Sequence, residues 1–316
     1  MKDIPPAVAA GPFTVRDGAE LGLTARVLEG RRFSKPWRGV RVVRGAPETL
    51  FERCRAAALV LPHSAVFSHE TALELGRWLA PGMGDGPSRY AEREDTRAPI
   101  HVTVPHHAVR PQRVGMVGHR TDLLGDEILH LGGLRVTSPW RTWLDLGATS
   151  SEVDLVILAD ALRRRVGTCP YQASIEGRRG ARALRRALTR SRSGVDSPME
   201  TRLRLLFEDA ELPEPAVNRP VVRSDGSPLH RPDLSWPRWR VAADYDGRHH
   251  ADRDSPQDVR SGRASDWRVR QDISRGDLLD DEGWILRVFT SFDVFHAPAR
   301  AVERMRAALR RGGADV

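Results

Sequence analysis

Apolar and polar positions change their spacing several times along the chain, and each change predicts a new element. Residues 13–43 contain two short segments with helical spacing. Thr14 can cap the first of these helices, and Thr24 can cap the second. From Trp37 to Val43, apolar and basic residues then alternate around Gly39, as they do in a β-wing. This order is typical of a winged helix-turn-helix, and a small helical bundle with a solvated basic face fits it equally well.

A winged helix-turn-helix would bring basic side chains to DNA, because its second helix enters the major groove and its wing lies close to phosphates. The candidates for DNA contacts in this part of the chain are Arg26, Arg31, Arg32 and Arg38.

Helical and strand patterns mix in residues 46–166, which predicts an α+β domain. Residues 47–80 have helical spacing, and Ser68 is placed to cap the second of two helices. Three strands are expected after them, at residues 100–105, 114–120 and 134–139. Two amphipathic helices should follow, at residues 140–146 and 151–165.

A Gly- and Arg-rich stretch, residues 167–196, then predicts a linker that contains a helix. It leads to a capped helix over 197–212, in which Ser197 and Glu200 have the spacing of a capping box. A hairpin is expected in 231–245, a buried strand in 284–289, and an amphipathic helix at the end of the chain. The predicted class is therefore multi-domain α/β, with domains at 1–45, 46–166 and 197–316.

The amino-acid composition gives the protein a net positive charge. Fifty Lys and Arg residues against 42 Asp and Glu give a net charge of +8 among 316 residues, which favours phosphate-rich partners. An arginine-rich codon usage explains the same excess equally well. The two cysteines are far apart, and no stretch is long and apolar enough for a membrane span. We expect a cytoplasmic protein without a membrane partner.

The residues with the clearest chemistry are two aspartates in the expected hairpin, Asp233 and Asp244. Pairing of the strands would bring both carboxylates to one end of a sheet, where Mg²⁺ or Mn²⁺ could bind between them. Glu200 would be a third acid, and His249 and His250 are candidates for proton transfer. On spacing alone, ordinary structural roles for these residues are favoured: aspartates that form turns, a glutamate that caps a helix, and histidines on the surface.

The order of these residues weighs against the ordinary explanations. Glu200 in SPMETRLR, Asp233 in RPDLSWP, Asp244 and Asp246 in VAADYDGRHH, and the segment GWILRVFTSFDV at 283–294 resemble a nuclease-like domain related to very-short-patch-repair endonucleases, in the PD-(D/E)XK superfamily. The resemblance covers residues 197–296 and implies a restriction-endonuclease-like α/β/α core with a metal-dependent site.

Two departures from the superfamily pattern bear on activity. The segment that usually reads acid-x-lysine is Asp244-Tyr245-Asp246, without a lysine, although histidine takes that role in the very-short-patch group. A position where relatives carry glutamate holds aspartate, which is one methylene shorter. Arginines near these residues either contact DNA phosphates or lie on a solvated helix face. The candidates for DNA contacts among them are Arg263, Arg268 and Arg270.

The first half of the chain resembles the antitoxin-like proteins of type IV abortive-infection systems. The resemblance covers residues 10–165 and rests on SHETALELG at 68–76, IHVTVP at 100–105 and RVTSPWRTWLDL at 135–146. It implies an N-terminal domain that binds DNA. A protein toxin as the main partner is a separate hypothesis, which does not follow from the resemblance. Arg141, Thr142 and Asp145 in the last motif are either functional or, as we favour, structural.

Together these observations predict a cytoplasmic DNA-binding protein with a Mg²⁺-dependent endonuclease domain. The alternative is a DNA-binding regulator or antitoxin whose nuclease-like domain is inactive.

Overall fold

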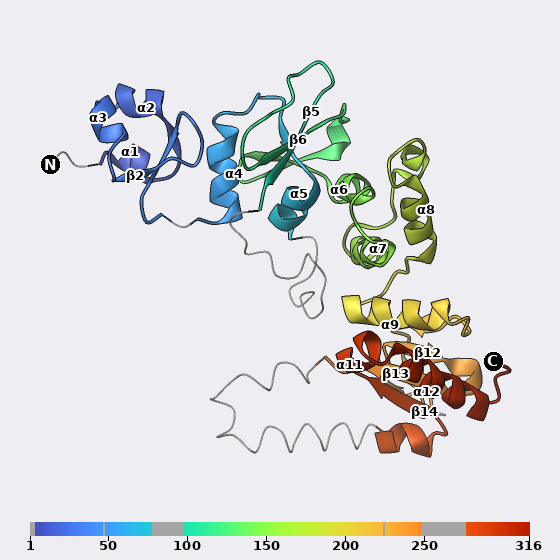
Figure 1. Ribbon diagram of the computed structural model, residues 1–316. Coiled ribbons are helices and arrows are strands. Elements are labelled where there is room, and N and C mark those ends of the chain that lie inside the picture. Colours follow the sequence, from blue (N-terminus) through green and yellow to red (C-terminus); the bar gives the residue numbers. More distant parts are fainter. Residues whose placement is uncertain (1–3, 47, 78–97, 224, 248–275) are drawn as a thin grey trace, which may run out of the picture. The chain divides into compact units, whose positions relative to one another are not determined.

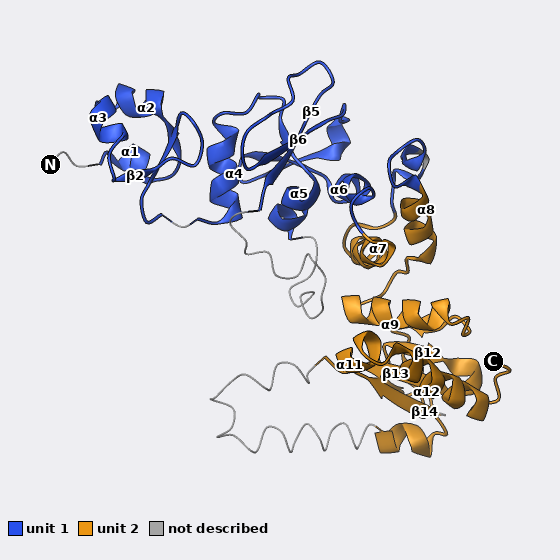
Figure 2. Cartoon of the chain, viewed as in Figure 1, with its two compact units in different colours: residues 1–79, 89–150, 169–181 blue, residues 80–88, 151–168, 182–316 orange. Residues whose placement is uncertain are grey.

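The computed structural model describes residues 4–46, 48–77, 98–223, 225–247 and 276–316. The chain is a mixed α/β protein with more than one compact unit, as predicted (Figure 1). Unit 1 comprises residues 1–79, 89–150 and 169–181, and unit 2 comprises residues 80–88, 151–168 and 182–316 (Figure 2). None of the described helices combines the length and apolarity that a membrane span requires.

Unit 1 begins with three short helices and a small antiparallel sheet. The helices are α1 (Pro6–Ala9), α2 (Val15–Glu20) and α3 (Ala25–Leu28), and the strands are β1 (Phe13–Thr14), β2 (Phe33–Ser34) and β3 (Val40–Val43). The sheet order is β1-β3-β2, and its core consists of Val8, Phe13, Leu23, Leu28 and Phe33. We name residues 4–46 the N-terminal module.

The two predicted caps of this module behave differently. Thr14 accepts a hydrogen bond from the backbone N–H of Asp17, and the Asp17 carboxylate accepts one from the N–H of Thr14, which completes a capping box. Thr24 is at the N-cap position of α3, but its side chain makes no capping hydrogen bond. The helix α3 is a single turn of four residues.

The rest of unit 1 is built on a five-stranded sheet of order β6-β5-β4-β8-β7. Its strands are β4 (Val66–Phe67), β5 (Ile100–Val104), β6 (Met116–Arg120), β7 (Ile128–Leu131) and β8 (Leu134–Thr137), and its helices are α4 (Leu50–Ala58), α5 (His69–Gly76) and α6 (Pro139–Leu146). Three of these strands were predicted. The strands β4 and β7 were not, and β4 interrupts residues that we expected to be helical.

Ser68 was expected to cap α5 through its side chain, and this was wrong. Ser68 is at the N-cap position, but its hydroxyl makes no capping bond. It accepts a hydrogen bond from Thr103 Oγ1 (2.8 Å) and contacts His69 Nδ1 (2.9 Å) instead. The hydroxyl is thus engaged by β5 and by its own neighbour in the chain.

The residues of the RVTSPWRTWLDL motif pack inside unit 1. The buried Arg141 forms ion pairs with Glu127 (3.0 Å) and Asp145 (2.7 Å), and the Thr142 hydroxyl lies 2.6 Å from that of Thr137. These contacts fasten α6 to the segment between β6 and β8, which is a structural role.

Unit 2 contains a four-stranded sheet of order β14-β13-β12-β9. Its strands are β9 (Ala216–Val217), β12 (Leu234–Trp236), β13 (Val241–Tyr245) and β14 (Ile285–Phe289), and β10 (Val221–Val222) and β11 (Pro228–His230) form a separate hairpin. The predicted hairpin is present as β12 and β13, joined by the 3-10 turn η3 (Pro237–Trp239). The sheet packs against α9 (Pro198–Asp209) and α12 (Pro298–Arg311) around Leu203, Phe207, Trp236, Phe289 and Met305.

The expected final buried strand, β14, lies at the edge of the sheet, parallel to β13. Phe289 is fully buried, but Val288 is 45% exposed, so the strand is only partly buried among the described residues. The short helix α11 (Ser291–Phe295), which follows β14, was not predicted.

Two helices from outside the predicted C-terminal domain also belong to unit 2. They are α7 (Glu152–Val166) and α8 (Ala181–Arg190), and α8 lies within the predicted linker. Asp160 of α7 forms a buried ion pair with Arg204 of α9 (2.9 Å), and Arg190 of α8 pairs with Glu152 and Glu208.

Candidate functional site

The register of the β12–β13 hairpin places Asp233 and Asp244 beside each other. Leu234 is opposite Ala243, so the preceding residue, Asp233, faces Asp244. The backbone N–H of Asp233 donates to Asp244 Oδ1 (3.2 Å), and the N–H of Tyr245 donates to Asp233 Oδ2 (2.6 Å). Each carboxylate is thus fixed by the backbone of the opposite strand.

Glu200 reaches the same region from the first turn of α9. Ser197 caps this helix by accepting a hydrogen bond from the N–H of Glu200 (3.2 Å). The Glu200 carboxylate does not accept a bond from the backbone N–H of Ser197, so the predicted capping box is incomplete. Its Oε2 atom accepts instead from the N–H of Asp196 (2.9 Å) and from Nδ2 of Asn218 (2.6 Å). The amide of Asn218 turns the glutamate toward the sheet and away from the helix cap.

Burial and mutual repulsion make these acids hard to ionise together. Burial raises the pKa of Asp233 to about 7, and the nearby charges of Glu200 and Asp244 add to this effect. Burial also raises the pKa of Glu200, against the hydrogen bonds from Asp196 and Asn218. Asp233, Asp244 and Glu200 therefore form one electrostatically coupled group, which we name the acidic cluster.

His230 is a member of this site that the sequence analysis missed. Its Nε2 atom lies 2.8 Å from Asp244 Oδ2, at the end of β11. The only signal in the sequence was its position three residues before Asp233, in HRPD.

The other predicted residues fall into two groups. Asp246 follows β13, is half-buried, and donates its backbone N–H to the carbonyl of Phe289 (2.7 Å). The remainder lie outside the described residues, and they are His249, His250, Arg263, Arg268 and Arg270.

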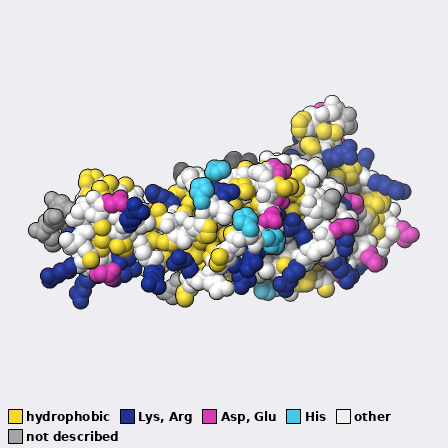
Figure 3. Space-filling view, turned by 90° about the horizontal axis from the view of Figure 1, so that it is seen from above, with side chains coloured by type: hydrophobic (Ala, Val, Ile, Leu, Met, Phe, Trp, Pro, Cys, Tyr) yellow, Lys and Arg dark blue, Asp and Glu magenta, His cyan; other side chains and the backbone are white. Residues whose placement is uncertain are grey.

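The predicted DNA-contacting arginines of the N-terminal module lie on or near α3 and β3. Arg26, Arg31 and Arg38 are exposed, and Arg32 is half-buried. On the face drawn in Figure 3, basic side chains are spread among acidic and apolar ones instead of forming one continuous patch. The module thus has basic side chains that are exposed to solvent, but the distribution of charge alone does not identify a DNA-binding surface.

The acidic cluster is chemically suited to a divalent cation. Burial, and then repulsion from Glu200 and Asp244, raise the pKa of Asp233, and a cation between Asp233 and Asp244 would offset both effects. Oxygen ligands are those that Mg²⁺ prefers. The fixed carboxylates would leave coordination positions for water and for phosphate oxygens. The site thus has the oxygen donors that a divalent cation requires.

Comparisons with known proteins give one distant relationship. Two curated relatives, the uncharacterized proteins MT2308 and Rv2248 from two strains of Mycobacterium tuberculosis (CDC 1551/Oshkosh and ATCC 25618/H37Rv), are each 25% identical over 234 residues. The alignment covers 72% of this chain and 80% of each relative. No protein-family model and no solved structure matches the chain.

Proposed function

We propose that unit 2 is a nuclease-like domain that hydrolyses phosphodiester bonds with the help of Mg²⁺ or Mn²⁺, and that the whole chain acts on DNA. The observation that carries the proposal is the acidic cluster: the hairpin holds Asp233 beside Asp244, with Glu200 close enough to raise the pKa of Asp233. Three coupled acids at one end of a sheet are a costly arrangement, and a bound cation would offset that cost.

Each residue of the cluster would have a separate task. Asp233 and Asp244 would hold the cation, which supplies Lewis-acid polarisation of a phosphate and of a bound water. His230 orients Asp244, because its Nε2 atom is within hydrogen-bond distance of Oδ2. Asn218 fixes Glu200 near Asp233, where the glutamate would help to position a water molecule.

The N-terminal module would bring the chain to DNA. Three short helices beside a three-stranded sheet agree with a winged helix, and the exposed Arg26, Arg31 and Arg38 would contact phosphates or base edges. We therefore assign binding to this module and chemistry to unit 2.

The decisive experiment is incubation of the purified chain with supercoiled plasmid in Mg²⁺, Mn²⁺ or EDTA. The wild type is compared with Asp233→Asn, which keeps the shape of the side chain, and with Asp281→Asn, an exposed control in the same unit. The proposal expects nicking or linearisation that needs the metal, is lost in Asp233→Asn and persists in Asp281→Asn. Cleavage that survives Asp233→Asn would overturn the site assignment.

The second candidate is a DNA-binding regulator or antitoxin without nuclease activity. Two observations favour it: Asp246 occupies the place of the superfamily's lysine, and one Glu200 oxygen is already engaged by two donors. A regulator need show no stabilisation by Mg²⁺ or Mn²⁺, whereas an active site should show a thermal shift that Asp244→Ala removes. For an antitoxin, a neighbouring gene should encode a nucleotidyltransferase-like toxin, and its absence would count against that version.

A further inference from the structure

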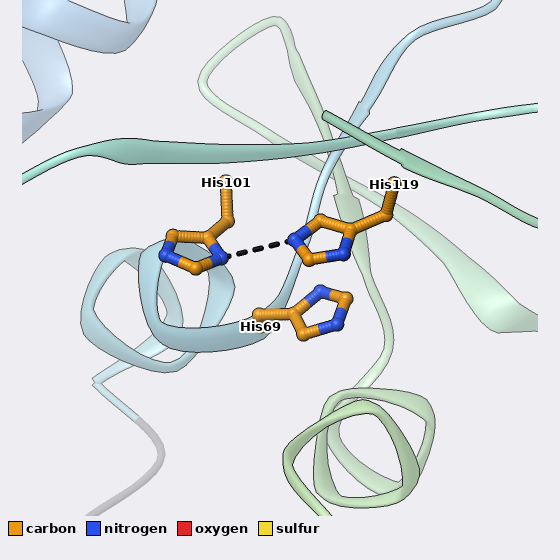
Figure 4. A group of neighbouring side chains, drawn as sticks. All are labelled: His69, His101 and His119. Atoms are coloured by element: carbon orange, nitrogen blue, oxygen red, sulfur yellow. Dashed lines mark hydrogen bonds between the residues drawn. The ribbon is translucent and has the colours of Figure 1, made fainter. Parts of the chain in front are cut away.

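Unit 1 contains a cluster of histidines that the proposed nuclease does not use. His69 begins α5, His101 is on β5 and His119 is on β6, and Figure 4 shows His101 directed toward His119, with the ring of His69 stacked against that of His119. One potential ligand atom of each ring lies within 4.8 Å of the other two. Among the described residues, no other three His, Cys, Asp or Glu side chains approach one another this closely.

The sheet brings these residues together from distant points in the sequence. Strands β5 and β6 are parallel, with Thr103 opposite His119, so His101 and His119 emerge from the same face. Strand β4 pairs with β5 on its other side, and the N–H of Ser68 donates to the carbonyl of His101 (3.1 Å). His69 therefore meets the other two at the point where β4 ends and α5 begins.

The spacing of two of the ligand nitrogens fits a small tetrahedral ion. With Zn–N bonds of about 2.0–2.1 Å, two ligand nitrogens of a tetrahedral site lie roughly 3.3 Å apart. His101 Nδ1 is 3.0 Å from His119 Nε2, and it is 3.4 Å from Oε2 of Glu70. Insertion of an ion would therefore require the first pair to separate by only a few tenths of an ångström.

The Glu70 carboxylate is a second, independent indication of a ligand. Its Oε2 atom is buried and has no hydrogen-bond partner among the described residues. An unsatisfied buried carboxylate oxygen is costly, and a cation beside it would remove that cost. The single proton available on His101 Nδ1 cannot serve both His119 and Glu70, so the pocket is incompletely paired without an ion.

The positive charge of Arg141 acts on His69, but Glu127 and Asp145 compensate it through their ion pairs with Arg141.

The surroundings orient at least one ring. His69 Nδ1 lies 2.9 Å from Ser68 Oγ, and that hydroxyl is in turn bonded to Thr103. A ring N–H donated to an oxygen is the usual outer-shell contact of a metal-binding histidine, and it leaves the other nitrogen free for the ion. His69 also has a left-handed backbone (φ +53°), an uncommon conformation for a residue with a side chain.

We propose that His69, His101 and His119 form a site for a zinc-class divalent transition metal ion that fastens the start of α5 to β5 and β6, with Glu70 beside His101 as the candidate fourth ligand. Three imidazole nitrogens favour Zn²⁺ over Mg²⁺, which prefers oxygen. A fourth ligand from Glu70 would make the site a structural one. It is separate from the acidic cluster in both residues and preferred metal, so it does not depend on nuclease activity.

The test uses the full chain without a histidine tag, stripped with a chelator and then equilibrated with Zn²⁺. Bound metal is measured by inductively coupled plasma mass spectrometry. We expect one Zn²⁺ per chain in the wild type, in Asp233→Asn, and in His107→Ala, which removes an exposed histidine from the loop after β5. His119→Ala should retain almost none, and Glu70→Gln should bind about 10–100-fold more weakly.

Cobalt provides a second measurement that also reports geometry. Co²⁺ in a four-coordinate site with nitrogen ligands absorbs visible light much more strongly than hydrated Co²⁺, and the wild type should show this band. Circular dichroism checks the fold of His119→Ala, and if that variant unfolds, Glu70→Gln and the wild-type stoichiometry still decide. A wild-type chain that takes up neither ion, or a folded His119→Ala that binds one Zn²⁺ per chain, would overturn the proposal.

Discussion

Asp233 and Asp244 are joined through the backbone: the N–H of Asp233 donates to Oδ1 of Asp244 across 3.2 Å. The bond orients one carboxylate, but it does nothing to neutralise the other. The two acids are thus held together by strand pairing against their own repulsion, and Glu200 adds to that repulsion. Such an arrangement should lower stability when no cation is present.

Replacing Asp233 by asparagine should therefore stabilise the metal-free protein at high pH. The folded-state pKa of about 7 exceeds the ordinary value of 3.8, so this proton favours the folded state below pH 4, and the benefit is lost as the pH rises through 7. In EDTA at pH 8, Asp233→Asn should unfold later in urea than the wild type, by roughly 1–3 kcal/mol. The difference should shrink toward pH 4, and a variant that is less stable than the wild type at pH 8 would contradict this explanation.

The contact between Asn218 and Glu200 leads to a second prediction. Asn218 Nδ2 donates to Glu200 Oε2 (2.6 Å) and to the carbonyl of Gly194 (3.0 Å). Asn218→Asp replaces this donor with a carboxylate facing two acceptors, and should cost about 2–3 kcal/mol at pH 8. The cost should decrease in acid, because protonation restores a donor.

The control for this change is Asn218→Gly. Asn218 has a left-handed backbone (φ +48°), which glycine adopts without strain. This variant isolates the lost hydrogen bond and should cost less than Asn218→Asp. Equal losses in urea denaturation would show that the like charge at residue 218 is unimportant.

The sequence predicted the parts of the fold whose pattern is local. The β12–β13 hairpin was predictable because Pro and Gly bound two apolar runs, and its pairing brought Asp233 to Asp244 without knowledge of any other element. Strand β4 was missed because two residues are too few to show alternation. Strand β14 was predicted to be buried, since its apolar residues do not reveal that it lies at an edge.

Contacts between distant segments were not predictable from spacing. His69, His101 and His119 are separated by 32 and 18 residues, and no short metal-binding motif has such intervals. Only the order β6-β5-β4 makes them neighbours. The placement of Glu200 similarly depends on Asn218, which comes from the loop after β9.

The buried pair of Asp160 and Arg204 supports a third prediction. Their side chains are each 2% exposed and lie 2.9 Å apart, and Asp160 also accepts bonds from Thr201 and the N–H of Arg192. Arg204→Met would leave Asp160 buried without its cation and should cost about 3–5 kcal/mol. The double variant Asp160→Asn/Arg204→Met should recover part of that loss.

The exposed pair of Arg192 and Glu214 is the comparison for this experiment. The Glu214 side chain is 65% exposed, so removing its charge should cost at most about 1 kcal/mol. Glu214→Gln is the suitable variant, because it leaves the backbone contacts of Arg192 intact. If Arg204→Met costs no more than Glu214→Gln, then α7 is not fastened to α9 by charge.

The proposed DNA contacts of the N-terminal module predict a change in salt dependence. Each arginine that neutralises a phosphate contributes about 0.9 to the slope of log affinity against log salt concentration. The triple variant Arg26→Ala/Arg31→Ala/Arg38→Ala should therefore bind duplex DNA more weakly and lower that slope by about 2–3. Arg16→Ala is the control, because Arg16 is exposed on α2 but already paired with Glu20 (2.9 Å). Fluorescence anisotropy at several salt concentrations measures both quantities. An unchanged slope in the triple variant would move DNA binding away from this module, whatever the nuclease assay gives.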